Sequence, residues 1–260
     1  MTRAPYRVVL ITGASSGLGA ALARSYAGPD TALGLVARNA ERLEETAATC
    51  RAAGAAVETA AIDVVDGSVL AAWLADFDRD HPVDLLIANA GTSAGPDAED
   101  AGEAAATTLR QIEVNLVGAV NTIAPLVPLI CARRRGRIVA IASVAAYRGL
   151  PYSPGYCASK AGLRAYVEAL RPRLAPHGVG VTVVCPGFFS SPMTERWEGP
   201  MPFLMSGERA ARRIKRGVDR GRPRIDFPWP LVFGMRFCDL APAMIGDGIL
   251  RNFRFHIRSA

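Results

Sequence analysis

Residues 12–19 read Thr12-Gly13-Ala14-Ser15-Ser16-Gly17-Leu18-Gly19, and Thr12 ends the apolar run 6–12. Glycine permits a tight turn and a close approach of the backbone to another molecule. An alanine-rich stretch follows to about residue 27, so the pattern indicates a strand, a glycine-rich turn and a helix. The first N–H groups of such a helix are free to bind a pyrophosphate. The spacing GxxxGxG therefore predicts a dinucleotide-binding turn, with a purely structural turn as the alternative.

The same turn also contains a motif of serine hydrolases. Gly13-Ala14-Ser15-Ser16-Gly17 matches GxSxG, in which Ser15 would be the nucleophile. A hydrolase of that kind requires earlier strands and an upstream oxyanion loop. Only twelve residues precede Gly13, so the position in the chain disfavours a hydrolase.

Beyond this turn, the sequence alternates between strand-like and helix-like segments. Near-continuous apolar strands separated by helices indicate a parallel sheet that is covered on both faces. We therefore expect an α/β protein, a Rossmann-like doubly wound sheet of about seven mostly parallel strands in one domain, 1–260. The predicted strands are 6–12, 31–37, 56–62, 83–88, 137–142, 179–184 and 224–227, and the predicted helices include 41–53, 65–77, 102–134 and 155–174.

Composition excludes several classes of protein. Half of the 260 residues are apolar and 21% are charged, which is typical of a globular protein with a sizeable core. Five scattered cysteines without a CxxC pair and three dispersed histidines argue against a disulfide framework and a metal centre. We find no signal-peptide pattern and no apolar run near ~18 residues, the best stretch being 231–250. We therefore expect a cytoplasmic protein without a transmembrane segment.

The net charge of +6 comes from an excess of arginine. Only two of the 30 basic residues are lysines, and arginines cluster at 133–137 and 209–224. Because regularly interleaved aromatic residues are missing from these clusters, we interpret them mainly as solvated surface and expect no nucleic-acid partner. Contact with an acidic cofactor or with a membrane surface is the less favoured alternative.

The second predicted strand bears on the choice of cofactor. Sites for NAD usually place an acidic residue near the end of this strand, where it binds the ribose 2′-hydroxyl. Here the residues are Val36-Ala37-Arg38-Asn39. The planar guanidinium of Arg38 matches the geometry of a 2′-phosphate, so we expect NADP(H) in preference to NAD(H). A surface arginine with no ligand is the alternative.

Candidate catalytic residues follow the fifth predicted strand. Tyr156 and Lys160 are four residues apart in Tyr156-Cys157-Ala158-Ser159-Lys160, so on a helix they share one face. A phenol with a pKa near 10 is a weak acid–base catalyst at neutral pH unless a nearby cation lowers its pKa. Ser143 ends the fifth strand, at the carboxyl edge of the sheet where sites of α/β proteins form.

Taken together, these motifs resemble the short-chain dehydrogenase/reductase family. The resemblance covers residues 6–194 in the order and spacing of that family. Its motifs here are Thr12–Gly19, Asn89-Ala90-Gly91, Asn115, Ser143, Tyr156 with Lys160, and Pro186-Gly187. Two departures are mild: Ala88 precedes Asn89 where many members have asparagine, and Ser191 stands where threonine is common.

The resemblance implies a role for each matching residue. Tyr156 would transfer the proton, Lys160 would lower the tyrosine pKa and bind the nicotinamide ribose, and Ser143 would bind the substrate oxygen. Asn115 would hold a water that links Lys160 to solvent. The cofactor would contact Gly13, Ser15, Ser16, Gly17, Leu18, Gly19, Arg38, Asp63, Val64, Asn89, Ala90, Gly91, Pro186, Gly187 and Ser191. The resemblance also implies a homodimer or homotetramer formed through the helices 102–134 and 155–174.

These observations predict an NADP(H)-dependent oxidoreductase that interconverts a carbonyl and a secondary alcohol, acting as a ketoreductase. A catalytically silent NADP-binding regulator or scaffold is the alternative, and the complete set of catalytic residues weighs against it. Residues 188–206 are rich in aromatic residues and methionine, which suggests an apolar lid over a bulky substrate, or else ordinary core packing. Residues 228–260 form a variable C-terminal segment that either extends this wall or contacts a subunit or a membrane.

Overall fold

Side chains of the strand β1 (Val8–Thr12) alternate between two hydrophobic layers. In the computed structural model, which describes residues 6–95, 102–251, 253 and 255–257, Leu10 packs into one layer while Val9 and Ile11 pack into the other. All three side chains are fully buried. Successive side chains of a strand point to opposite faces, so an unbroken apolar strand requires cover on both faces. The sequence of this strand therefore specifies a central position in a three-layer protein.

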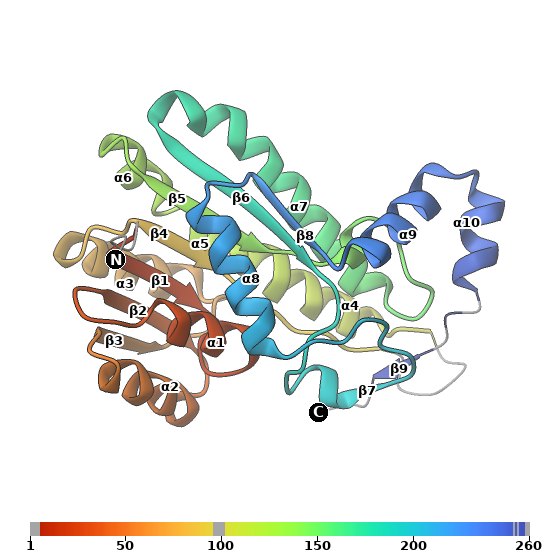
Figure 1. Ribbon diagram of the computed structural model, residues 1–260, viewed down its shortest axis with the longest axis horizontal. Helices are drawn as coiled ribbons and strands as arrows, with labels where there is room; N and C mark the ends of the chain where they lie inside the picture. The colour runs from red at the N-terminus through yellow and green to blue at the C-terminus, as the bar shows by residue number, and fades with distance from the viewer. Residues whose placement is uncertain (1–5, 96–101, 252, 254, 258–260) are drawn as a thin grey trace.

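The sheet contains seven strands, all parallel, in the order β3-β2-β1-β4-β5-β6-β8 (Figure 1). This confirms the predicted Rossmann-like fold. The strand order reverses between β1 and β4, and ligands of such sheets bind outside the carboxyl ends of the strands at this point. The other strands are β2 (Ala32–Ala37), β3 (Ala56–Ala61), β4 (Leu85–Ala88), β5 (Gly136–Ile141), β6 (Val179–Pro186) and β8 (Arg224–Phe227).

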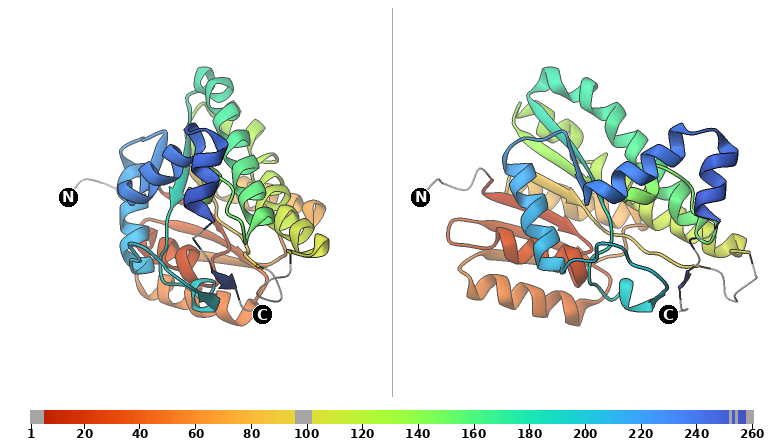
Figure 2. Two further views of the ribbon diagram at one scale, coloured as in Figure 1. Left: turned by 90° about the vertical axis from the view of Figure 1, so that its right-hand side faces the viewer. Right: turned by 45° about the vertical axis from the view of Figure 1, so that its right-hand side comes forward.

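Helices cover the two faces of the sheet in separate layers (Figure 2). One layer consists of α1 (Gly17–Tyr26), α2 (Ala40–Ala52) and α8 (Gly207–Asp219). The other contains α3 (Gly67–Asp80), α4 (Ala105–Ile112), α5 (Gly118–Ile123), α6 (Val127–Ala132) and α7 (Pro154–Leu174). The crossover helices thereby leave the carboxyl edge of the sheet open for a site.

The helical region predicted at 102–134 is not one regular helix. A π-helical turn, Glu113–Val117, separates α4 from α5, and a further break precedes α6. The residue Asn115 lies within this turn. A π-turn accommodates an extra residue in a helix and frequently marks a functional site. Regular apolar periodicity does not reveal such an insertion, which is why the sequence predicts an uninterrupted helix.

The stretch Ala105–Ala132 is long and apolar enough to cross a membrane by length and composition alone. The expectation that 231–250 is the most membrane-like stretch is therefore wrong. Buried residues of this region, among them Val114, Ile123 and Ile130, belong to the hydrophobic layer beside the sheet. The apolar character of the stretch is thus used in the core of the protein.

The C-terminal part of the chain adds two helices beyond the sheet. Helix α9 (Trp229–Leu240) follows β8 and leads to α10 (Ala243–Leu250), and the pair projects at the right of Figure 1. The predicted lid segment forms few regular elements, but its two-residue strand β7 (Trp197–Glu198) pairs with β9 (His256–Ile257) in an antiparallel manner. Trp197 also stacks on Phe255 with 4.0 Å between ring centroids. The end of the chain therefore packs against the segment 188–206.

Candidate active site

The glycine-rich turn after β1 is tightly packed against α1 and β4. Gly13 and Gly17 have φ values of +68° and +51°, in the left-handed region that favours glycine. A Cβ atom at Gly19 would lie 2.1 Å from the carbonyl oxygen of Gly13. The GxxxGxG spacing therefore reflects a backbone conformation and packing that other residue types cannot take up without distortion.

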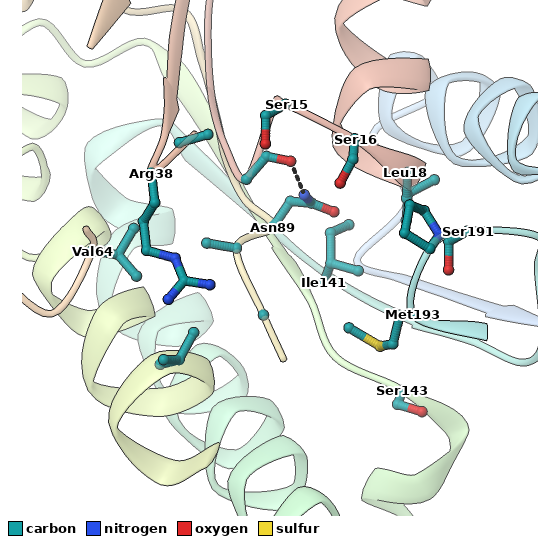
Figure 3. Close-up of a pocket in the computed structure, with 18 of the residues that line it drawn as sticks. Ser15, Ser16, Leu18, Arg38, Val64, Asn89, Ile141, Ser143, Ser191 and Met193 are labelled. Atoms are coloured by element: carbon teal, nitrogen blue, oxygen red, sulfur yellow. Dashed lines mark hydrogen bonds between the residues drawn. The ribbon is translucent and has the colours of Figure 1, made fainter. Parts of the chain in front are cut away.

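Hydrogen bonds tie this turn to the end of β4. The backbone N–H groups of Asn89 and Ala90 donate to Thr12 Oγ1 at 3.1 and 3.3 Å. Asn89 Nδ2 donates in return to the carbonyl oxygens of Thr12 and Gly13 at 3.0 and 3.3 Å. The two motifs that lie 77 residues apart thus form one rigid wall at the switch point of the sheet (Figure 3).

The turn fits the pyrophosphate of a dinucleotide. Ser16 is the N-cap of α1, yet its side chain makes no capping hydrogen bond, and the first turn of α1 carries no acidic residue. The hydroxyl and the first N–H groups of α1 are therefore available to a phosphate, and the helix dipole favours an anion at this position.

A cavity of about 570 Å³ extends from this turn along the carboxyl edge of the sheet. Figure 3 shows Arg38 at one end of it and Ser143 with Met193 at the other. The cavity brings together all but one of the site residues predicted from the sequence. Those lining it are Gly13, Ser15, Ser16, Gly17, Leu18, Gly19, Arg38, Asp63, Val64, Asn89, Ala90, Gly91, Ser143, Tyr156, Lys160, Pro186, Gly187 and Ser191.

Ser143, Tyr156 and Lys160 come from two adjacent elements. Ser143 caps the short 3₁₀ turn that follows β5, and its Oγ accepts a hydrogen bond from the N–H of Ala145 at 3.1 Å. Tyr156 and Lys160 lie on successive turns of α7. Lys160 is buried, and its Nζ donates to the carbonyl oxygen of Ile141 at 2.9 Å. The lysine is therefore fixed by the strand that also leads to Ser143.

Burial controls the acid–base properties of this pair. Desolvation raises the pKa of Tyr156 to about 12, and a hydrogen bond with Ser143 opposes the shift. Desolvation likewise lowers the pKa of Lys160 to about 8. Burial therefore sets the direction of the shift at Tyr156, and the lowering by Lys160 that the family resemblance implies stays a prediction. At neutral pH the phenol of Tyr156 holds its proton.

Asn115 is the predicted site residue that does not line the cavity. Its side chain is fully buried, and Oδ1 accepts a hydrogen bond from the N–H of Thr92 at 2.7 Å. Its Nδ2 donates to Thr92 O and to Ser159 Oγ, both at 2.9 Å. Asn115 thus joins the segment after β4 to helix α7, one residue away from Lys160. Its amide is held by protein groups, so this side chain positions its neighbours.

The far end of the cavity carries a charged cluster. Asp63 Oδ2 lies 2.9 Å from Arg110 Nη2 and 3.7 Å from Arg38 Nη1. Arg38 is the more exposed of the two arginines, and Arg42 also lines this end. Because Arg110 compensates the carboxylate of Asp63, the guanidinium of Arg38 is available to an anion.

Comparison with known proteins agrees with this geometry. The family model described as short chain dehydrogenase matches residues 7–201. The protein belongs to the short chain dehydrogenase family. It is therefore an NAD(P)-dependent oxidoreductase, and the family resemblance stated from its motifs is confirmed.

Relatives of this dehydrogenase include oxidoreductases and ketoacyl reductases. An uncharacterized oxidoreductase of Myxococcus xanthus is 33% identical over 255 residues, which cover 98% of this chain and 100% of the relative. A monensin polyketide synthase putative ketoacyl reductase of Streptomyces virginiae is 34% identical over 197 residues, 75% of this chain and 76% of the relative.

Solved structures show the same fold with cofactors bound. A short-chain dehydrogenase from Sphingobium yanoikuyae in complex with NADPH is 28% identical, with a TM-score of 0.77 and coverage of 95% and 96% of the two chains. A variant of actinorhodin polyketide ketoreductase with NADPH is 27% identical, with a TM-score of 0.75 and coverage of 89% and 99%. These structures support a nicotinamide cofactor for the dehydrogenase.

Several residues that shape the site were missed by the sequence analysis. Arg110 of α4 meets Asp63 across 47 residues of sequence, and the carbonyl of Ile141 is a backbone group that no motif reports. Phe189 and Met193 also line the cavity. Both residues lie in the segment 188–206, whose aromatic and methionine content predicts an apolar lid.

Proposed function

We propose that this dehydrogenase reduces a carbonyl to a secondary alcohol with NADPH. The observation that carries the proposal is one cavity with Ser143 at one end and Arg38 at the other (Figure 3). Tyr156 is hydrogen-bonded to Ser143, Lys160 follows it on α7, and the glycine-rich turn lines the same cavity. A nicotinamide dinucleotide bound along this cavity would place its reactive ring beside the acid–base residues. The ketoacyl reductases among the relatives support the same class of reaction.

Ser143, Tyr156 and Lys160 would each have a different role in the reaction at the substrate oxygen. The cofactor, when bound, supplies the hydride. Tyr156 would give its hydroxyl proton to the carbonyl oxygen, and Ser143 Oγ would donate a hydrogen bond to that oxygen as negative charge develops on it. Lys160 would stabilise the resulting phenolate by its charge. Because burial raises the pKa of Tyr156 to about 12, the phenol holds its proton at neutral pH and has it available for the carbonyl oxygen.

The preference for NADPH rests on the charges at the adenosine end of the cavity. Arg38 and Arg42 present two guanidinium groups there, and Arg110 lies 2.9 Å from the carboxylate of Asp63. A 2′-phosphate gains charge-assisted hydrogen bonds from such groups, whereas the 2′-hydroxyl of NADH lacks the charge to exploit them.

Apolar residues of the segment 188–206 contribute to the cavity. Phe189, Pro192 and Met193 line it, Met193 on the side of Ser143 in Figure 3, and in the same segment Phe188 packs edge-on against Trp197 with 5.0 Å between ring centroids. Such a wall suits a ketone with a sizeable apolar portion, of lipid-like, steroid-like, polyketide-like or aromatic character.

We further propose that the protein forms a homo-oligomer through α4–α6 and α7, where Leu109 and Val117 are exposed.

Fluorescence titration of the purified protein with NADPH and NADH tests the cofactor assignment without a substrate. We expect tighter binding of NADPH, and Arg38→Asp should weaken NADPH binding by at least about tenfold while changing NADH binding little. Equal weakening of both cofactors would refute the assignment of Arg38. NADPH oxidation in the presence of bulky and small ketones then tests the substrate class, and a preference for small ketones would contradict it.

A further inference from the structure

Exposed apolar side chains are concentrated on the C-terminal helices α9 and α10. Seven large apolar residues of these helices are at least half exposed, Met244 at 89%, Leu240 at 82%, Trp229 at 74% and Phe233 at 67% among them. The others are Phe237, Ile245 and Ile249. Contiguous exposed patches of this kind mark contacts with another molecule or with a membrane. We name these seven residues the apolar tip.

A row of arginines lies along helix α8 and its C-terminal cap, Arg220. Arg209, Arg212, Arg216 and Arg220 are exposed and recur every three or four residues, so they share one face of the helix. Within the described part of the chain, none of these four side chains takes part in an ion pair. The acidic residues of this helix are already paired, Glu208 with Arg24 and Asp219 with Lys215.

Helix α8, which carries the arginine row, and helix α9, which carries four residues of the apolar tip, lie toward the same side of the molecule (Figure 2). In the left view of Figure 2, α8 and the first turns of α9 lie on the left, α10 lies nearer the middle, and α7 lies on the right. The helices α9 and α10 also project beyond the body of the protein. The charges on these two helices are mixed: Arg236, Arg251 and Asp239 are exposed, and Asp247 pairs with Arg148. The arginine row therefore supplies the positive charge of this side.

We propose that this side of the protein docks on an anionic lipid bilayer. The apolar tip would enter the boundary between headgroups and acyl chains, where tryptophan and apolar side chains are favoured. The arginine row would contact the negatively charged headgroups, which attract basic residues near the surface. Apolar burial and charge attraction together give the two contributions that interfacial binding requires.

A second copy of the chain fits this surface less well. A two-fold symmetric contact places the same patch of both subunits face to face. A two-fold contact centred on the apolar tip would cover the apolar side chains but would place no negative charge opposite either arginine row. Nucleic acid would accept the arginines but would leave seven apolar side chains in water. An anionic bilayer satisfies both groups of residues.

Vesicle flotation of the full chain tests the proposal. We expect the protein to float with vesicles that contain phosphatidylglycerol, to float much less with phosphatidylcholine alone, and to be released by high salt because exposed charges are screened. The variant Phe233→Ser/Met244→Ser should reduce binding to both kinds of vesicle by at least about tenfold. Arg212→Glu/Arg216→Glu should reduce binding to the anionic vesicles by at least about tenfold.

A matched control is Val69→Ser, which removes an exposed apolar side chain from α3. It should leave flotation unchanged, and thermal melting should show that all variants are folded. Absence of flotation with phosphatidylglycerol vesicles would overturn the proposal. The proposal would also be overturned if Phe233→Ser/Met244→Ser kept its lipid binding but had a smaller molecular mass than the unmodified protein in light scattering. That result would show that a second copy of the chain covers the apolar tip. These outcomes do not depend on cofactor binding.

Discussion

Tyr147 donates a hydrogen bond of 2.8 Å to Asp226 Oδ2, which joins the turn after β5 to strand β8. Ser143 begins the same turn, and Asp226 is paired in the sheet with Cys185, the residue before Pro186. This bond therefore connects three segments that carry or adjoin site residues. Burial raises the pKa of Asp226, so its carboxylate depends on the polar partners that it retains.

Removal of the Tyr147 hydroxyl should destabilise the protein. In Tyr147→Phe the half-buried carboxylate of Asp226 loses its donor, and we expect a loss of about 1–3 kcal/mol in the free energy of unfolding, measured by urea denaturation. Asp226→Asn keeps an oxygen that accepts the same bond and should lose less. A larger loss in Asp226→Asn than in Tyr147→Phe would contradict this account.

The glycine-rich turn should not tolerate a methyl group at position 19. A Cβ atom there would lie 2.1 Å from the carbonyl oxygen of Gly13, so Gly19→Ala must displace the turn that forms the pyrophosphate site. We expect NADPH binding to weaken by at least about tenfold and the melting temperature to fall. Gly28→Ala is the matched control, because a Cβ at Gly28 meets nothing within 4 Å. Comparable losses in the two variants would argue against a specific packing role for Gly19.

Tyr156→Phe should abolish proton transfer while leaving the cofactor site intact. General acid catalysis typically contributes about 10²–10⁴-fold, so we expect kcat for ketone reduction to fall by at least about 10². The dissociation constant for NADPH, measured by fluorescence titration, should change little. Tyr152→Phe serves as a control, since Tyr152 contributes a ring contact with Phe255 that the substitution keeps. Turnover by Tyr156→Phe at the level of the unmodified protein would exclude the assigned role.

The buried Lys160 should make the free energy of unfolding depend on pH. Its pKa is lowered from 10.5 in the unfolded chain to about 8 in the folded protein. Between these values the unfolded chain binds more protons, so Lys160 makes the free energy of unfolding rise with pH from about 8 to 10.5. Below pH 8 its burial costs a constant amount, on the order of 3 kcal/mol at most.

Comparison with Lys160→Met isolates this contribution from that of other titrating groups. The variant also leaves the carbonyl of Ile141 without its donor, but that loss is independent of pH. Urea denaturation at several pH values above 7 should therefore show that the difference in stability between the two proteins changes across this window. A constant difference would show that Lys160 has an ordinary pKa.

The sequence by itself determined the sheet and most of the site. Local patterns predict these features: the apolar strands, the glycine spacing at 13–19, and the positions of Ser143, Tyr156 and Lys160. Each pattern reflects a physical requirement of its own segment. Buried parallel strands must be apolar, a phosphate-binding turn must lack side chains, and residues four apart on a helix share a face. These requirements hold before any tertiary contact is known.

Only the tertiary structure decided how groups distant in the sequence affect one another. The π-turn at Asn115, the contact of Arg110 with Asp63 and the bond between Lys160 and Ile141 all depend on how helices pack at the carboxyl edge of the sheet. The pKa of Tyr156 also follows from burial, which is a property of the packed protein and not of the motif. From the sequence, residues 228–260 were only a variable C-terminal segment. The exposure of the apolar tip depends on the direction in which α9 and α10 leave the sheet.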